Sequence, residues 1–350
     1  MKKSILFCFI FFGLNSTTSQ GIGNLLLAGE DASLLTENYL NPAVSGLMSG
    51  MNSGWYSTAK THKKLGFDIT LGTSMSFTPS SGQTFNFNSD QYSYISVANG
   101  SSELPTVLSD NDSETIFDVS IPTTLAGEFK VGSFTMPGGV ANDLPINAVP
   151  TPFVQFGLGL PFKTEVNLRY VPNVNYDSKV KGSSMGIGIQ HDLTQYLGLL
   201  GKLPFSISVM GAYSKANIEY TINNNNLTSG ISVTNGLARF KLDTWTVQAL
   251  GSLDLKILTF YAGLGYNSGT SNFDVNGDYI LTYDVEDSSG NSVGSPVTEN
   301  ISDPISLGFS SSGTRATVGA RLNLLFFKIF ADYTIQEYNT ASAGIAFSFR

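Results

Sequence analysis

The stretch LGFDITLGTSMSFT, from Leu65 to Thr78, alternates apolar and polar residues from one position to the next. A period of two places successive side chains on opposite faces of a β-strand, so this strand has one apolar face and one polar face. The alternation returns in nine further segments, which are residues 154–160, 166–170, 185–189, 205–213, 240–255, 258–266, 316–324, 327–335 and 345–349. The sequence therefore predicts an all-β protein in which ten strands are visible.

The composition excludes several other classes of protein. Only 13% of the 350 residues are charged, 12% are aromatic and 36 are glycine. After residue 14 the chain has no apolar run of about 20 residues, which is the length that a membrane-spanning helix needs. A disordered chain would carry more charge and fewer aromatic residues. The net charge of −8 argues against nucleic acid as a partner, because phosphate binding needs clusters of Lys and Arg.

The first residues have the pattern of a secretory signal peptide. Lys2 and Lys3 form a positive segment, an apolar segment follows, and small polar residues precede Gln20. We expect residues 1–19 to be removed on export. The only cysteine, Cys8, lies in this segment, so the mature chain is expected to form no disulfide.

The lengths of the connections favour a barrel over a sandwich. Short turns such as 161–163 and 325–326 alternate with long connections, of which residues 79–150 and 268–312 are the longest. Outer-membrane barrels show this pattern because their short turns face the periplasm and their long loops face outside. The two longest loops hold 15 of the 27 acidic residues. We therefore predict that residues 64–350 form a transmembrane antiparallel β-barrel of about 10–14 strands in the outer membrane, in contact with its lipid.

Two local features bear on the strand count and on the strand register. The alternation in 240–255 changes phase between Asp243 and Trp245, which predicts a β-bulge at that point. The first long loop contains two further candidate barrel strands, Phe117–Ile121 and Glu128–Phe134. If such segments lie in the barrel, the strand count rises to twelve or fourteen.

The segment before the first strand does not alternate. Within residues 20–63, Asp31 is expected to cap a helix that ends at Asn41-Pro42, because proline disfavours helical backbone at the residue before it. Helix and loop at the periplasmic end of a barrel can fold into its lumen. We therefore expect this segment to be a short helical luminal plug.

Both ends of the barrel carry further signals. Ile345 to Arg350 alternates aromatic residues up to the end of the sequence, and we expect the barrel assembly machinery to bind this strand. Trp55 and Tyr56 are expected at the inner membrane boundary, and Tyr213 at the outer one, as residues of aromatic girdles.

Two stretches carry a resemblance to known families. Gly29 to Ala32, followed by Asn41 to Ala43, resembles the N-terminal hatch of the long-chain fatty acid transporter (FadL-like) family. Asn52 to Asp68, together with the ending Ser348 to Arg350, is similar to an uncharacterised family of outer-membrane β-barrel proteins. The first resemblance implies a hatch and uptake of a hydrophobic ligand. The second covers almost the whole mature chain and implies the barrel fold.

Charged residues recur at positions where the predicted strands face the lumen. One interpretation is an ion-paired interior that packs against the plug, and the other is a polar conduit wall that tunes selectivity. The Asn-Pro turn would be the part of the plug that moves. The candidate lumen-lining residues are Asn41, Pro42, Glu165, Arg169, Arg239, Asp243, Arg315, Arg321 and Asp332.

Catalytic and metal-binding motifs are weak in this sequence. His62 and the pair His191-Asp192 are the only histidine positions, and no nearby sequence feature supplies a nucleophilic serine. Asp110 to Asp112 and Asp274 to Asp278 offer oxygen ligands for calcium, but without the spacing of an EF-hand. We therefore expect no enzyme activity, no metal site and no cofactor.

Two functional hypotheses follow. The first is passive transport of a small hydrophobic molecule through the plugged barrel. The alternative is a non-transporting interaction or structural protein whose acidic external loops face a partner or a secreted cargo. A transporter should have an apolar pocket at the external end of the lumen, whereas an interaction protein should fill that volume with side chains.

Overall fold

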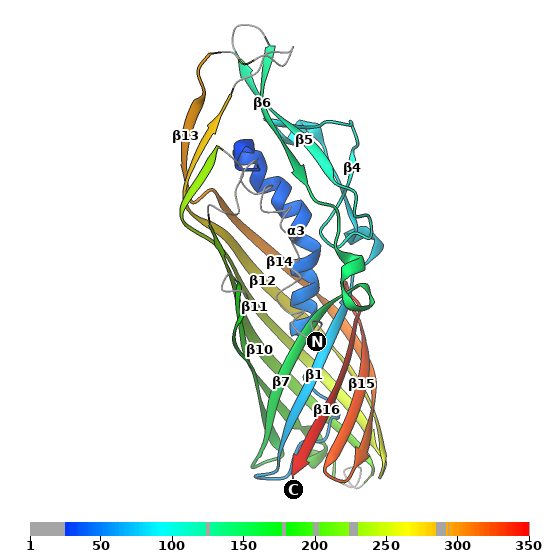
Figure 1. The fold of residues 1–350 in the computed structure, drawn as a ribbon. Coiled ribbons are helices and arrows are strands. Elements are labelled where there is room, and N and C mark those ends of the chain that lie inside the picture. The colour runs from blue at the N-terminus through cyan, green and yellow to red at the C-terminus, as the bar shows by residue number, and fades with distance from the viewer. Residues whose placement is uncertain are drawn as a thin grey trace.

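Ten antiparallel strands close into a ring (Figure 1) in the computed structural model, which describes residues 25–123, 127–176, 180–198, 203–223, 230–284, 292 and 294–349. The order around the ring is β11-β10-β9-β8-β7-β1-β16-β15-β14-β12, and β11 pairs with β12 to complete it. The strands are β1 Phe67–Phe77, β7 Ala148–Leu160, β8 Thr164–Tyr176, β9 Val180–Asp192, β10 Phe205–Ile222, β11 Ile231–Asp254, β12 Leu258–Tyr283, β14 Ile305–Leu324, β15 Phe327–Ile335 and β16 Thr340–Phe349. All ten strands that the alternation predicts lie in this transmembrane-type barrel, and the predicted leader, residues 1–19, lies outside the described residues.

The C-terminal strand closes the barrel against the first one. β16 pairs with β1 from Phe67 opposite Phe349 to Ser76 opposite Thr340, and with β15 on its other edge. The rings of Phe67 and Phe349 stack with their centroids 5.1 Å apart on the outer surface. Neither edge of β16 is left unpaired, so the ring has no open seam at the junction of its two ends.

The strands differ greatly in length, and the long ones rise beyond the rest of the barrel. β1, β7, β8, β9, β15 and β16 have 9–13 residues, close to the roughly 9–11 that cross a bilayer. β10, β11, β12 and β14 have 18, 24, 26 and 20 residues. Figure 1 shows these four strands continuing past the others as a curved wall at the end that carries the long loops.

The apolar face changes sides along the long strands. Near the short turns, apolar side chains such as Val247 point outward and polar ones point into the ring. Beyond Trp245 the pattern reverses, because Phe240 and Leu242 are buried inside while Lys241 is exposed outside. The strand itself keeps its register, since β11 and β12 pair without interruption from Leu237 to Asp254.

The expected bulge between Asp243 and Trp245 is therefore wrong. The only register shift in the β11–β12 pairing lies between Thr234 and Leu237. The change of phase in the sequence marks the point where the outer surface stops contacting lipid and begins to contact water. A strand buried on its inner face and wetted outside must carry its apolar residues inside, without any change in backbone geometry.

The first long loop folds into its own small sheets. β2 (Thr84–Asn86) pairs with β4 (Glu103–Pro105), and β3 (Ile95–Val97), β5 (Thr115–Thr123) and β6 (Gly127–Met136) form a three-stranded sheet. The two extra segments expected in the barrel are thus strands, but they lie in this separate sheet. Their inward side chains pack on the helix instead of facing lipid.

The second long loop is shorter than predicted. Much of 268–312 is strand, because β12 continues to Tyr283 and β14 begins at Ile305. The short strand β13, Val297–Ser302, pairs with the far end of β12. The outward face of these extensions carries polar residues. The alternation that identifies a membrane strand needs apolar residues on that face, so the sequence of the extensions resembles that of a loop.

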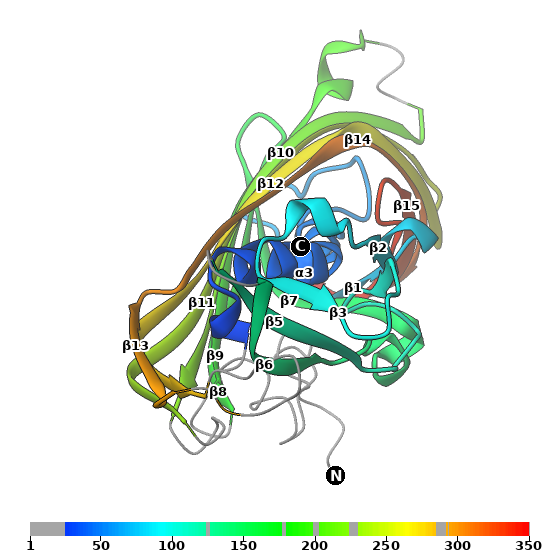
Figure 2. The same cartoon turned by 90° about the horizontal axis from the view of Figure 1, so that it is seen from above.

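One α-helix fills the upper part of the ring. Helix α3 runs from Glu30 to Met51 and follows the short 3₁₀ helix η1, Leu26–Ala28. Seen from above, in Figure 2, it lies inside the curve of β12, β14, β7 and β1. No helix among the described residues is long and apolar enough to cross a membrane.

Two expectations for this helix are wrong. The helix continues through Pro42 to Met51 instead of ending at Asn41-Pro42, and its first cap residue is Gly29, not Asp31. A proline inside a helix costs about 3 kcal/mol, so packing must supply more than that. The last ten residues of α3, from Pro42 onward, are all buried against the ring and the sheets, which provides that packing.

The lipid-facing part of the outer surface can be tested on one strand. Leu264 and Asn272 are both exposed on the outward face of β12, one below and one above the change of face. Leu264→Arg is expected to destabilise the folded barrel in lipid by about 2–4 kcal/mol, because the charge would enter hydrocarbon. Asn272→Arg should leave the stability unchanged. Urea titration of both variants in vesicles measures this, and equal effects would contradict the assigned boundary.

Candidate functional site

A non-helical segment leads from the end of α3 through the barrel to the start of β1. This luminal segment, residues 52–66, passes down the inside of the ring towards the short turns. Tyr56 donates a hydrogen bond to Gln248 of β11 (3.0 Å), and the His62 N–H donates to Glu165 of β8 (2.8 Å). The segment therefore contacts wall strands that are separated by β9 and β10.

Two arginines from the wall meet the C-terminal end of α3. Arg169 Nη1 donates to the carbonyl of Met51 (3.2 Å), and Arg315 Nη1 donates to the carbonyl of Asn52 (2.8 Å). Arg315 Nη2 also donates to Ser53 Oγ (2.8 Å). The last carbonyls of a helix lack partners within it and carry partial negative charge, so two cations stabilise this end.

Arg169 also lies between two aromatic rings. Its guanidinium carbon is 3.9 Å from the centroid of the Trp55 ring and 4.0 Å from that of Phe153. Trp55 is 1% exposed and donates from its indole nitrogen to Met51 (3.0 Å). The expectation that Trp55 and Tyr56 belong to a membrane girdle is therefore wrong, because both are buried inside the lumen.

Wall side chains also bind several polar groups in the rest of the luminal segment. Gln155 donates to the carbonyl of Trp55 (3.3 Å), and Gln190 donates to that of Thr58 (3.1 Å). Arg321 donates to the Ser57 hydroxyl (3.2 Å). An extended chain in a barrel has no sheet partner for its own backbone, so these side chains take that role.

A histidine cluster holds the segment near the short turns. His62 Nδ1 lies 2.7 Å from Glu165 Oε2, and His62 Nε2 lies 3.1 Å from Ser348 Oγ. The carboxylate oxygen Oδ2 of Asp68 is 3.7 Å from the same Nε2. Ser348 therefore lies within hydrogen-bond distance of His62. Nothing in the sequence indicated this contact, because the two residues are 286 positions apart and meet only when the ring closes.

The order Ser, His, Glu is that of a nucleophile, a base and an orienting acid. Acyl transfer also needs donors for the developing oxyanion. The backbone N–H groups of Ser348 and His62 already have acceptors, since Ser348 N–H donates to Phe326 (2.7 Å) and His62 N–H donates to Glu165. Chemically, the cluster can accept and donate protons and can tie three chain segments together.

A cavity of 560 Å³ lies beside the lower part of the luminal segment. Its lining mixes both signs of charge, with Asp68 and Glu165 facing Arg321 and Lys328. Trp55 and Phe330 contribute apolar surface. The space is therefore suited to water or a polar solute more than to a hydrocarbon chain.

The opposite end of the lumen is filled by side chains. We call the apolar cluster there the upper core, formed by α3, β5, β6 and the upper parts of the long strands, with Leu35, Leu47, Met48, Phe117, Phe134, Phe240, Tyr279 and Leu281 among its buried members. Tyr39 of α3 donates to the carbonyl of Gly138 (3.1 Å), and burial raises the pKa of Tyr39, so it stays a neutral donor.

Asp31 attaches the first turn of α3 to the small sheet. Its carboxylate accepts hydrogen bonds from the backbone N–H groups of Ser93 (3.0 Å), Tyr94 (2.6 Å) and Ile95 (3.1 Å). Asp31 is buried, so these bonds are shielded from water. The loop between β1 and β7 is thereby fixed to the helix at its top.

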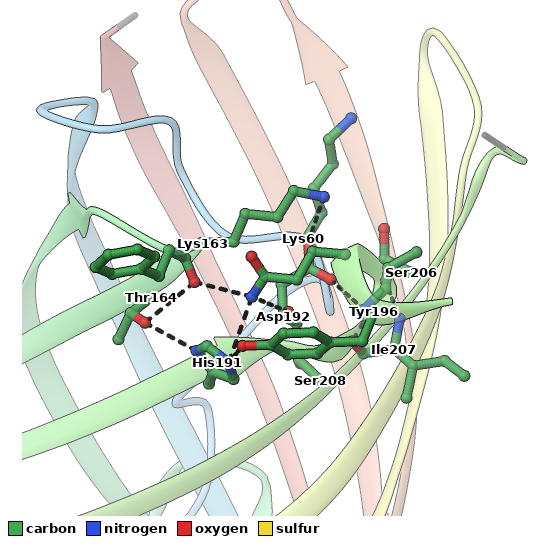
Figure 3. Close-up of polar contacts among 12 residues, drawn as sticks. Lys60, Lys163, Thr164, His191, Asp192, Tyr196, Ser206, Ile207 and Ser208 are labelled. Atoms are coloured by element: carbon green, nitrogen blue, oxygen red, sulfur yellow. Dashed lines mark hydrogen bonds and ion pairs between the residues drawn. The ribbon is translucent and has the colours of Figure 1, made fainter. Parts of the chain in front are cut away.

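The second histidine belongs to a separate cluster at the short turns (Figure 3). Thr164 Oγ1 lies 2.8 Å from His191 Nδ1, and the Tyr196 hydroxyl lies 3.1 Å from Nε2. Lys163 is 3.7 Å from Asp192, whose carboxylate accepts from the next turn of chain. These contacts fix the β7–β8 and β9–β10 connections to each other.

The candidate lumen residues divide into three groups. Five of them are buried inside the ring, as predicted: Glu165, Arg169, Arg315, Arg321 and Asp332. The first four contact the luminal segment or the end of α3 directly. Asp332 instead accepts a hydrogen bond from Tyr261 of β12 (3.0 Å).

The other four candidates do not line the lumen as expected. Arg239 and Asp243 point outward from β11, because they lie above the change of face, and this expectation is wrong. Asn41 is exposed and Pro42 is buried, but both are helical and form no turn. Within the described part of the chain, no three His, Cys, Asp or Glu side chains gather as metal ligands.

A family model matches residues 1–349, and its description is "family of unknown function (DUF6588)". The chain belongs to this family. The residues similar to an uncharacterised barrel family, Asn52 to Asp68 and the C-terminal end, are thus the luminal segment and closing strand of a DUF6588 barrel. The likeness of the N-terminal stretch to a FadL-like hatch stays a prediction. No curated protein matches the chain.

Solved structures of outer-membrane barrels are distantly similar to this DUF6588 chain. Ail, the attachment invasion locus protein of Yersinia pestis, is 10% identical, with 82% of this chain and 100% of that chain covered and a TM-score of 0.27. The translocator domain of NalP from Neisseria meningitidis is 10% identical (93% and 99% covered, TM-score 0.25). A Pseudomonas aeruginosa FadL homologue is 9% identical (95% and 96% covered, TM-score 0.22). Similarity at this level carries no inference about activity.

Proposed function

We propose that the protein is an outer-membrane barrel that its own N-terminal segment seals, and that it displays its small sheets and acidic loops to a partner outside the cell. In this proposal α3 and the luminal segment are a plug. The observation that carries the proposal is the filled external end of the lumen, where α3 is buried in the upper core. The outward apolar surface of the lower barrel supports the location in a membrane.

The contacts of the plug support a permanent seal. Arg169 and Arg315 hold the end of α3, and glutamines of the wall hold the carbonyls below it. Removing such a plug would leave buried donors and acceptors without partners, each costing about 1–3 kcal/mol. In this proposal the His62 cluster is a further tie between plug and wall and not a catalytic site.

Passive transport of a small hydrophobic molecule is the second candidate. The 560 Å³ cavity beside the luminal segment supports a route by its volume alone, because its charged lining suits a polar solute better than a hydrocarbon. Transport through the external end of the lumen would also require α3 to leave the upper core. The two candidates therefore differ in whether the plug has to move.

A reversible disulfide can separate them. A Cβ atom placed on Gly46 would lie 3.4 Å from the Cβ atom of Val149 on β7, close to the roughly 3.8 Å that a disulfide spans. Cys8 is the only native cysteine and lies in the predicted leader, so Gly46→Cys with Val149→Cys gives a mature chain with one pair. Single-channel conductance and liposome uptake of a labelled fatty acid are measured with the pair oxidised and reduced.

For a sealed barrel we expect no conductance and no uptake above empty liposomes in the wild type or in either state of the variant. If wild-type protein accelerates uptake, the oxidised variant does not and reductant restores it, then transport is the function and the sealed-barrel proposal is wrong. Each single-cysteine variant controls for the effect of the substitution itself.

A further inference from the structure

A patch of charged residues lies on the outside of the ring just above the lipid-facing surface. Tyr213 of β10 and Trp245 of β11 face each other at the top of that surface, and Lys215 and Asp243 are the next outward pair. Two residues along a strand span about 7 Å, which is the depth of a headgroup layer. The patch consists of Lys181, Lys215, Glu219, Arg239, Lys241 and Asp243, and we call it the basic patch.

Ion pairs neutralise only part of this patch. Lys215 lies 3.4 Å from Asp243, and Arg239 lies 3.0 Å from Glu219. Among the described residues, neither Lys181 nor Lys241 has an ion-pair partner, although both are exposed. Four cations against two anions leave a net charge of +2 on adjacent outward faces of β9, β10 and β11.

This positive charge is unusual for its end of the molecule. Residues 79–150 and 268–312 carry 15 acidic residues and one basic residue, Lys130. Lys130 is paired with Asp118 at 2.8 Å. Beyond the lipid-facing surface at the long-loop end, the described cations without an acidic partner are therefore the two lysines of the basic patch.

A groove of 470 Å³ connects the patch to exposed apolar side chains on the neighbouring strands β8 and β9. Tyr170 of β8 and Met185 of β9 line one side of the groove, and Lys215 and Asn217 of β10 and Lys241 of β11 line the other. A ligand that fits this groove has an apolar portion beside Tyr170 and Met185 and an anionic portion beside the lysines. Amphipathic lipids in the outer leaflet have that division at that height.

We propose that the basic patch is a binding site for the phosphate groups of an anionic lipid headgroup in the outer leaflet. Lys181 and Lys241 donate charge-assisted hydrogen bonds to the phosphate oxygens, and the groove beside Lys241 holds the first apolar part of the lipid. The proposal rests on the membrane location given above, but it does not depend on whether the barrel is sealed.

The test compares two pairs of lysine substitutions in the folded, full-length protein. Lys181→Gln with Lys241→Gln removes the unpaired charges of the patch. Lys64→Gln with Lys256→Gln removes the same charge from exposed positions at the short-turn end. Binding of fluorescent lipid A that carries two phosphates is titrated in detergent at low salt, after heat-dependent gel mobility has verified that each variant is folded.

We expect about 25-fold weaker binding for the patch variant, from a factor of about five for each lysine, and little change for the control pair. The same lipid without phosphates should bind the wild type as weakly as the patch variant binds the phosphorylated lipid. Equal losses for both variants, or no loss for the patch pair, would overturn the proposal. If millimolar inorganic phosphate displaces the lipid, the patch is a site for small anions and not for a headgroup.

Discussion

Replacing Trp55 by alanine is expected to lower the free energy of unfolding by about 3–5 kcal/mol, the cost of truncating a fully buried aromatic side chain. The ring contacts Arg169, and its N–H donates to Met51 at the end of α3. The change would remove one of the two aromatic rings that contact Arg169 and would leave a cavity in the centre of the lumen. We expect the plug to loosen before the barrel unfolds.

The chain contains a matched control for this change. Its other tryptophan, Trp245, is 43% exposed on the outer surface, so Trp245→Ala should cost far less. Urea denaturation in lipid, followed by the fluorescence of the tryptophan that remains, gives both values. Protease cleavage within residues 52–66 should increase in the Trp55 variant alone. Equal destabilisation of both variants would contradict the central role of Trp55.

Replacing Asp31 by alanine is expected to release the small sheet from the helix, at a cost of about 2–4 kcal/mol. Three backbone N–H groups lose a charged acceptor, and hydrogen bonds to charged groups each contribute about 1.5–3 kcal/mol, part of which water recovers at the exposed residues. Hydrogen exchange at residues 93–95 should become faster. Asp31→Asn should show a smaller effect, because one acceptor oxygen remains.

Glu30 offers the control for Asp31. It occupies the same first turn of α3 and carries the same charge, but it is exposed, and none of the backbone N–H groups of residues 93–95 donates to it. Glu30→Ala tests whether the favourable interaction of acidic residues with a helix N-terminus accounts for the result. Unchanged exchange at residues 93–95 in the Asp31 variant would show that other contacts hold this loop.

The alternation of residues was sufficient to locate all ten barrel strands. Each strand contacts lipid on one face and the lumen on the other, so every one carries the same local signal regardless of its neighbours. The signal failed only where the outer surroundings change from lipid to water. Arg239 and Asp243 were assigned to the lumen for that reason, although they lie on a strand whose existence was correctly predicted.

The N-terminal helix illustrates a different kind of failure. Pro42 is a helix breaker by its local chemistry, and the prediction followed that chemistry. The helix continues because residues 42–51 are buried by strands that lie far away in the sequence. Packing energy of this kind has no local signature, so the end of the helix could not be derived from its own residues.

The site shows the same division. The sequence by itself determined that Glu165, Arg169, Arg315 and Arg321 face inward, because inward orientation follows from strand parity. Only the tertiary structure decided what they contact. Which residues of the luminal segment lie at the height of each arginine depends on strand stagger and on the path of residues 52–66, and these are properties of the closed ring as a whole.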